Sequence, residues 1–182
     1  MGKIYVFLAD GFEEIEGLTV VDLLRRAGLE TVTVSIMGRK EITGSHRIIV
    51  HADELFENVQ FDDAKMLVLP GGMPGTLHLG EHLGLHHVLT KKMEENCPIS
   101  AICAAPSILG DLGALKGKRA VCYPGFEDRL AGAIVTENPV ETDGNITTSR
   151  GMGTAIPFAL AIIARFQGEE SAKKIANSVI WD

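Results

Sequence analysis

Short apolar runs alternate along the chain with segments whose apolar residues recur every three or four positions. The short runs are typical of strands buried on both faces, and the wider spacing is typical of helices that cover a sheet. The pattern predicts strands at 3–9, 31–36, 47–51, 65–69, 98–102, 119–122 and 133–136, with a hairpin over 141–148. It predicts helices at 14–27, 84–95, 104–110, 154–166 and 169–178.

This alternation predicts an α/β fold with a mostly parallel central sheet and helices on both of its faces. A chain of 182 residues without repeats, low-complexity stretches or linkers suits a single domain over 1–182. Ligands of such folds bind at the edge where the strands have their carboxyl ends. The functional residues are therefore expected in the loops that follow the strands.

Composition narrows the classes of function. The formal charge is −7, from 17 Lys and Arg against 24 Asp and Glu, and no basic run occurs, so neither nucleic acid nor a membrane is an expected partner. The apolar run at 3–9 is too short for a membrane span or a signal peptide. Three cysteines without a C-x-x-C pair favour a reducing compartment, so a cytoplasmic location is expected.

Cys103 is the strongest candidate for chemistry because it lies between the predicted strand 98–102 and the helical run that begins at Ala104. On such a turn a thiol faces the first N–H groups and the positive end of the helix dipole, which stabilise a thiolate. The turn therefore predicts a depressed pKa for Cys103. The alternative is a packing role, since cysteine is among the residues most often buried.

Two other loops meet Cys103 at the same edge of the predicted sheet. The first strand leads into Asp10–Glu16, and the strand 65–69 leads into Gly71-Gly72. A bare backbone N–H at Gly72 suits a developing oxyanion, although the two glycines also fit a simple turn. Glu16 either complements the helix dipole or, if buried beside the thiol, has a raised pKa and donates a proton. Glu13 and Glu14 are expected to be solvated or capping residues.

Four segments resemble the ThiJ/PfpI superfamily: Ala9–Glu16, Val68–Gly72, Ala101–Pro106 and Thr147–Thr154. Their order and spacing cover nearly the whole chain. The chain is most similar to the branch of the parkinsonism-associated protein deglycase, because Ala104 stands where protease-like members carry histidine.

This resemblance implies a flavodoxin-like three-layer sandwich that forms homodimers and needs no cofactor. It implies that Cys103 is the reactive cysteine, that Glu16 is its partner, and that the N–H groups of Gly72 and Ala104 face the sulfur. The activities attributed to the family are conversion of glyoxal or methylglyoxal to hydroxy acids, repair of glycated groups, and oxidative-stress sensing through a cysteine sulfinate.

Two positions depart from the family pattern. Tyr123 stands where members with glyoxalase activity have histidine, and a phenol with a reference pKa of ~10 is a poor base at neutral pH. Arg47 is separated from Ser45 by His46, whereas relatives place arginine directly after the serine. Tyr123 and Arg47 are therefore pocket candidates whose roles the sequence leaves open.

The remaining motifs favour ordinary structural roles. His78, His82 and His86 are spaced four apart, but Gly80 and Gly84 interrupt the segment, so a polar helix face is expected rather than a metal site. The glycine-rich Ser149–Gly153 lacks the G-x-G-x-x-G pattern of a nucleotide loop. Cys97 is expected at the surface or in packing, and Cys122 close to the pocket. Neither a metal nor a cofactor is expected.

The sequence thus predicts a cysteine enzyme whose small carbonyl substrate is a 2-oxoaldehyde. The alternative is an oxidative-stress sensor or chaperone-like protein in which Cys103 is oxidised rather than turned over. A hydrolase or amidase with the same turn would lack an adjacent histidine base. A homodimer is expected to form through the helix 14–27, where Val20 and Val21 broaden the apolar stripe.

Overall fold

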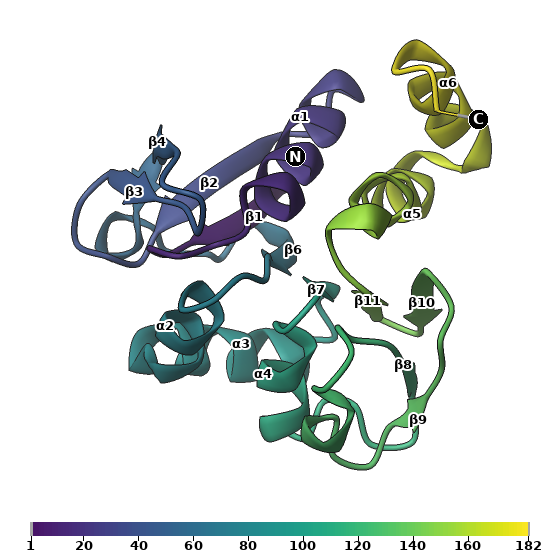
Figure 1. Ribbon diagram of the computed structural model, residues 1–182. Helices are drawn as coiled ribbons and strands as arrows, with labels where there is room; N and C mark the ends of the chain where they lie inside the picture. The colour runs from purple at the N-terminus through teal and green to yellow at the C-terminus, as the bar shows by residue number, and fades with distance from the viewer. Residues whose placement is uncertain (1, 182) are drawn as a thin grey trace.

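The computed structural model describes residues 2–181 and contains a central seven-stranded sheet (Figure 1). Its strands are β1 (Lys3–Leu8), β2 (Thr31–Ser35), β5 (Glu54–Leu55), β6 (Ala64–Leu69), β7 (Ile99–Ile102), β10 (Val140–Asp143) and β11 (Ile146–Ser149). Their order across the sheet is β10-β11-β7-β6-β1-β2-β5. Only the β10–β11 hairpin is antiparallel among these pairs, so the predicted, mostly parallel sheet is confirmed.

Helices cover both faces of this sheet. They are α1 (Glu14–Arg26), α2 (Gly75–Glu81), α3 (Leu83–Glu94), α4 (Pro106–Asp111), α5 (Ala155–Gln167) and α6 (Glu169–Ser178). Figure 1 shows α1, α5 and α6 on one side and α2, α3 and α4 on the other. Alternate residues of β1 enter the two cores: Ile4 and Val6 pack toward α1 and α5, while Tyr5 and Phe7 pack toward α2 and α3. This is the flavodoxin-like three-layer sandwich.

Two small sheets lie outside the central one. β3 (Glu41–Thr43) and β4 (Ile49–His51) form an antiparallel hairpin, and β8 (Arg119–Ala120) pairs with β9 (Ile134–Val135) in parallel. The strand predicted over 47–51 therefore begins only at Ile49. Arg47 lies in the hairpin turn with φ 65°, a left-handed conformation that ends strand pairing there.

The predicted helix 84–95 is preceded by a second helix, α2, that the sequence pattern did not indicate. The two helices are separated at His82, which has extended backbone angles and accepts a hydrogen bond from Leu85 N at 2.9 Å. His78 and His86 consequently lie on different helices. No helix within residues 2–181 is long and apolar enough to cross a membrane.

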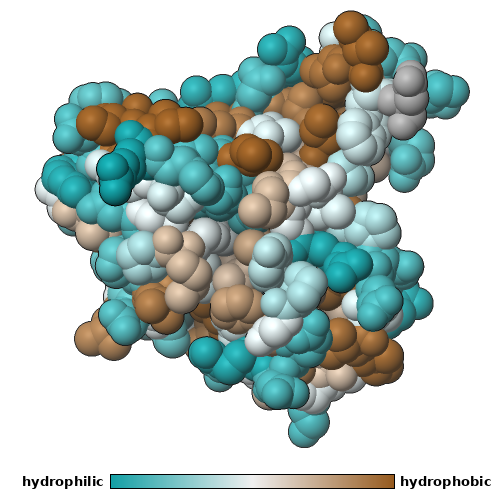
Figure 2. Space-filling view, viewed as in Figure 1, coloured by the Kyte–Doolittle hydropathy of each residue, from teal (hydrophilic) through white to brown (hydrophobic). Residues whose placement is uncertain are grey.

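The homodimer expected through the first helix stays a prediction, but Val20 and Val21, on which its interface was based, do not lie at the surface of α1. Val20 is fully buried and Val21 nearly so, and both belong to the core between the sheet, α1 and α5. The apolar residues exposed nearby are different ones: Ile15 on α1, and Ile48 and Ile49 on the β3–β4 hairpin. Figure 2 shows apolar surface on the side of the molecule that carries this hairpin.

Candidate functional site

Cys103 occupies a sharp turn at the carboxyl end of β7. Its φ is 66°, a left-handed conformation that costs a non-glycine residue about 1–3 kcal/mol. The turn is fixed on both sides, since Cys103 N donates to Ser149 O at 3.0 Å and Tyr123 N donates to Cys103 O at 2.8 Å. The helix α4 begins three residues later, at Pro106, rather than at the predicted Ala104. The strand-to-helix turn expected from the sequence is therefore present in a slightly longer form.

Glu16 lies beside this thiol. It sits in the first turn of α1, its side chain is fully buried, and its carboxyl group hydrogen-bonds with Cys103. Its Oε2 atom accepts a hydrogen bond from Gly71 N at 3.0 Å. Its Oε1 atom has no hydrogen-bond partner among the described residues, and a buried carboxyl oxygen without a partner is costly to maintain. Glu16 therefore has one hydrogen-bonded oxygen and one buried oxygen without a partner in the described part of the chain.

The glycine pair after β6 permits the close approach of these groups. A Cβ atom on Gly71 would lie 2.6 Å from both Cys103 Cβ and Glu16 Oε2. Gly72 has φ 92°, which favours glycine, and a Cβ there would lie 2.2 Å from Glu13 N. The N–H groups of Gly72 and Ala104 hydrogen-bond to the Cys103 sulfur. The sequence analysis interpreted Gly71 only as part of a turn. In the structure its backbone N–H donates to the Glu16 carboxyl group and orients it.

Burial determines the proton affinities of the pair. It raises the pKa of Glu16 from 4.5 to about 7, against the hydrogen bonds from Cys103 and Gly71 that lower it. Burial and the adjacent Glu16 carboxylate also raise the pKa of Cys103 to about 12, although the N–H groups of Gly72 and Ala104 oppose this. The raised pKa predicted for Glu16 is confirmed, whereas the depressed thiol pKa was wrong.

The two groups titrate as a pair, because the charge on either one disfavours charge on the other. When Glu16 is ionised it repels a thiolate, and when Glu16 keeps its proton that repulsion is absent. Because the pKa of Glu16 is about 7 and that of Cys103 is about 12, Glu16 ionises first and the sulfur keeps its proton at neutral pH. A thiolate therefore forms near neutral pH only when the thiol proton passes to Glu16, which then holds it beside the sulfur.

Tyr123 lies at the mouth of the site and is partly exposed. It lines a shallow pocket of about 240 Å³ together with Arg150, Met152 and neighbouring residues. A Cβ atom on Gly151 would lie 3.2 Å from Tyr123 Cδ2 and 3.8 Å from Glu16 Oε1, so the phenol ring and the free carboxyl oxygen flank the same glycine. Arg150 and Met152 are pocket residues that the sequence analysis did not identify individually, although it singled out their segment.

Arg47 is not brought to the thiol. Its side chain is exposed and makes no hydrogen bond or ion pair with any residue between 2 and 181. The neighbouring Ser45 hydroxyl contacts Glu13 and Glu14 instead.

Glu13 and Glu14 are buried, which corrects the expectation that they are solvated or capping residues. Neither makes the side-chain cap at the start of α1. Burial acts to raise the pKa of Glu14, but hydrogen bonds from its own backbone, from His46 and from Ser45 outweigh it and lower the value to about 2. Glu14 anchors the β3–β4 turn to the first turn of α1.

The other two cysteines are also buried. Cys97 donates to Ala64 O at 3.5 Å and has a packing role, with a pKa raised by burial. Cys122 lines a cavity of about 150 Å³ with Glu127 and Arg150, and burial raises its pKa to about 11. Since Tyr123 N is bonded to Cys103 O, Cys122 is close to the pocket as predicted.

Comparison with known proteins gives a consistent picture. The model of the DJ-1/PfpI family matches residues 2–165. The DJ-1beta protein of Drosophila melanogaster is 34% identical over 177 residues, covering 96% of this chain and 95% of its own. A deglycase of Pyrococcus abyssi is 35% identical over 154 residues, covering 83% of this chain and 91% of its own.

Other relatives are longer or have solved structures. The chain spans about two fifths of the Arabidopsis thaliana DJ-1 homolog B, with 35% identity over 98% of the chain and 41% of that protein. The structure of oxidized DJ-1 from Toxoplasma gondii superposes with a TM-score of 0.95 and 35% identity, covering 100% of this chain and 99% of that one.

Proposed function

The chain belongs to the DJ-1/PfpI family, and we propose that it is a cofactor-independent cysteine enzyme that converts 2-oxoaldehydes to 2-hydroxy acids. The observation that carries this proposal is the fully buried Glu16, which is hydrogen-bonded to Cys103 and keeps one oxygen free. A carboxyl group with a pKa of about 7 exchanges protons efficiently at neutral pH. The relatives named deglycase support chemistry on carbonyl adducts of this kind.

The first step is attack of the Cys103 sulfur on the aldehyde carbon. As the C–S bond forms, the Glu16 carboxylate takes the thiol proton, the C=O π electrons move to oxygen, and the protonated Glu16 delivers that proton to the oxygen to give a hemithioacetal. The N–H groups of Gly72 and Ala104 solvate the sulfur in the resting state and lie close to the charge that develops on oxygen. Glu16 is then a carboxylate.

The second step moves hydrogen from the former aldehyde carbon to the adjacent ketone carbon. The Glu16 carboxylate removes the C–H proton, the electrons form an enediol, and reprotonation at the second carbon gives a thioester of the 2-hydroxy acid. Carbon one is oxidised as carbon two is reduced, so no external oxidant is used. Water then cleaves the thioester, which releases the hydroxy acid and restores the thiol.

The test is the conversion of methylglyoxal to lactate in D₂O, followed by proton NMR without added cofactor. We expect lactate that carries deuterium at carbon two, with Cys103→Ser and Glu16→Gln both inactive. Absence of lactate with the wild-type protein, or undiminished turnover in Cys103→Ser, would contradict the proposal. Lactate without deuterium would replace the enediol with a direct hydride shift.

A second candidate is oxidative sensing by the same thiol. The N–H groups of Gly72 and Ala104, together with a protonated Glu16, form a set of donors that would also stabilise a cysteine sulfinate. The structural similarity to an oxidized DJ-1 supports this alternative. Titration with hydrogen peroxide tests it: a mass increase of 32 Da on the Cys103 peptide at low equivalents, in a protein without turnover, would favour sensing over catalysis.

A further inference from the structure

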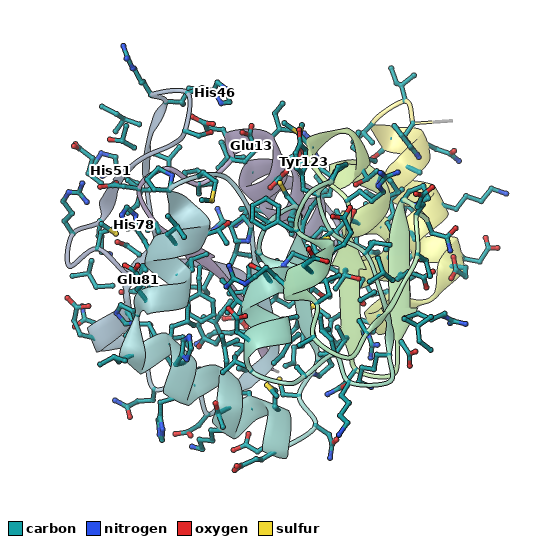
Figure 3. The ribbon with its side chains drawn as sticks, turned by 60° about the horizontal axis from the view of Figure 1, so that its bottom comes forward. Glu13, His46, His51, His78, Glu81 and Tyr123 are labelled. Atoms are coloured by element: carbon teal, nitrogen blue, oxygen red, sulfur yellow. The ribbon has the colours of Figure 1, made fainter. Side chains whose placement is uncertain are left out.

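A second group of reactive side chains lies outside the catalytic pair, where the β3–β4 turn meets the start of α1. His46 Nδ1 is 3.1 Å from Glu14 Oε2 and 3.5 Å from Glu13 Oε2. The Ser45 hydroxyl oxygen is 3.0 Å from each of these carboxylate oxygens and 3.0 Å from His46 Nδ1. Figure 3 shows His46 and Glu13 toward the same end of the molecule, with His51 farther along the hairpin.

The polar hydrogens of these side chains are too few to form a hydrogen bond at every one of these close contacts. The Ser45 hydroxyl has one hydrogen but three close polar neighbours, and the imidazole adds at most one more hydrogen at Nδ1. Two hydrogens therefore serve five short contacts, which leaves lone pairs facing one another. A cation at the centre would turn each of those repulsions into an attraction.

The spacing matches a metal coordination sphere. Zinc binds imidazole nitrogen and carboxylate oxygen at about 2.0–2.2 Å, so two ligands of a tetrahedral site lie about 3.3–3.5 Å apart. The distances from His46 Nδ1 to Glu14 and Glu13, 3.1 and 3.5 Å, are close to that separation. The ligand atoms of Glu13, Glu14 and His46 all lie within 4.8 Å of one another.

Glu13 contributes a second, largely buried carboxylate to this group. Its side chain is 7% exposed, and its only ion-pair partner among residues 2–181 is His46, which is 68% exposed. Its Oε2 accepts from the Ser45 hydroxyl, while its Oε1 accepts no hydrogen bond from the described residues. Glu13 and Glu14 thus bring two largely buried carboxylates to one exposed imidazole, and a metal ion would balance their negative charge.

Glu14 is already held as a metal ligand requires. Its Oε1 accepts hydrogen bonds from His46 N at 2.7 Å and Ile48 N at 3.4 Å. These backbone donors orient the carboxylate and leave Oε2 directed at the imidazole. Such supporting bonds to the second oxygen are typical of metal-binding carboxylates and reduce the reorganisation needed on binding.

We propose that Glu13, Glu14 and His46, with the Ser45 hydroxyl as a weaker fourth contact, form a binding site for a divalent transition-metal ion, best suited to zinc. An imidazole beside two carboxylates favours Zn²⁺ over Mg²⁺ and Ca²⁺, which prefer oxygen ligands alone. The site differs from the catalytic pair, since the Glu16 carboxyl group is bonded to Cys103 and Gly71. Together with the Ser45 hydroxyl, the two carboxylates and the imidazole fill the four positions of a tetrahedral ion.

The test is isothermal titration of the full-length chain with ZnCl₂, repeated with an excess of Mg²⁺. We expect one site per chain that Mg²⁺ does not displace, and a ~10-fold or larger loss of affinity in His46→Ala. His51→Ala is the matched control, because His51 is similarly exposed on the same hairpin and its one ion-pair partner within residues 2–181 is Glu41, at 4.0 Å. It should bind zinc as the wild type does.

Two further measurements separate this site from the thiol. Cys103→Ser should retain the zinc affinity, and the Co²⁺-loaded protein should show visible d–d absorption without the ultraviolet sulfur-to-cobalt charge-transfer band. Unchanged affinity in His46→Ala, or loss of binding in Cys103→Ser, would overturn the proposal. Since His46 is exposed, its replacement leaves the fold intact, so loss of binding in that variant reports on the ligand itself.

Discussion

At the scale of single residues, this site is controlled by one buried carboxyl group. Glu16 is fully excluded from solvent, hydrogen-bonded through one oxygen and unpartnered at the other. The burial that raises its pKa to about 7 also makes its ionised form costly to the folded state. The Glu16 carboxyl group therefore suits proton transfer, but its ionisation lowers the stability of the folded protein.

Replacing Glu16 with glutamine tests both consequences. The folded-state pKa is raised above the unfolded value of 4.5, so stability is fully present below pH 4.5 and decreases as pH rises to about 7. That change corresponds to about 3 kcal/mol at ~1.4 kcal/mol per pKa unit. We expect Glu16→Gln to lack this loss between pH 4.5 and 7 and to unfold at higher urea than the wild type at pH 8. Parallel urea curves for both proteins across this range would contradict the assignment.

The same variant should be inactive if Glu16 transfers protons. Turnover of 2-oxoaldehydes by the wild type should rise with pH through about 7, because the enediol step uses the carboxylate. We expect Glu16→Gln to lose ~10²–10⁴-fold in kcat and to lack this rising limb. Glu94→Gln, a change of an exposed carboxylate at the end of α3, is the control and should retain the wild-type profile.

Tyr123 offers a gain-of-function test. Its ring and Glu16 Oε1 flank the same glycine, Gly151, so a side chain at position 123 lies close to the proposed proton-transfer group. Histidine there would place a base that titrates near neutral pH beside the reacting carbons. We expect Tyr123→His to raise kcat with little change in KM. An unchanged kcat, with Glu16→Gln still inactive, would mean that Glu16 alone is a sufficient base.

At the scale of elements, the site is formed where β1, β6 and β7 end and α1 begins. The approach of these elements depends on Gly71, where a Cβ would lie 2.6 Å from both Cys103 Cβ and Glu16 Oε2. Overpacking of that kind costs about 1–3 kcal/mol, or separates the groups that must touch.

We therefore expect Gly71→Ala to reduce methylglyoxal turnover below a tenth of the wild-type value and to lower thermal stability. Gly153→Ala is the matched control, since a Cβ there meets no atom within 4 Å and the residue lies in the pocket-lining segment. It should change stability by less than ~0.5 kcal/mol. Equal effects of the two substitutions would exclude the close approach as the reason for the glycine.

The elements that position the site were predictable, because each has a strong local signal. Apolar runs at β1, β6 and β7 and the motif residues Glu16 and Cys103 led to the correct edge of the sheet. The helix α2 and the strand β3 were missed, since their short, half-polar segments are stabilised by tertiary contacts. The thiol pKa was also missed, because it depends on how deeply two side chains from distant segments are buried together.

At the scale of the whole molecule, the exposed apolar residues have a distribution that the sequence pattern did not reveal. Val20 and Val21 are buried in the core, while Ile15, Ile48 and Ile49 are each more than half exposed. These three isoleucines flank the Ser45–His46 turn and the acidic start of α1, so the exposed apolar surface adjoins the functional end of the protein. A homodimer predicted from the resemblance would bury this surface in preference to the valines.

Ile49→Glu tests this version of the dimer. A charge at a residue that is 58% exposed in the monomer is harmless to the fold, but it is costly in an apolar interface. We expect light scattering at micromolar concentration to give a dimer for the wild type and a monomer for Ile49→Glu. Leu83→Glu, at an 85% exposed position on α3 away from the hairpin, should remain dimeric. A wild-type monomer would refute the dimer itself, and a dimeric Ile49→Glu would place the contact on another face.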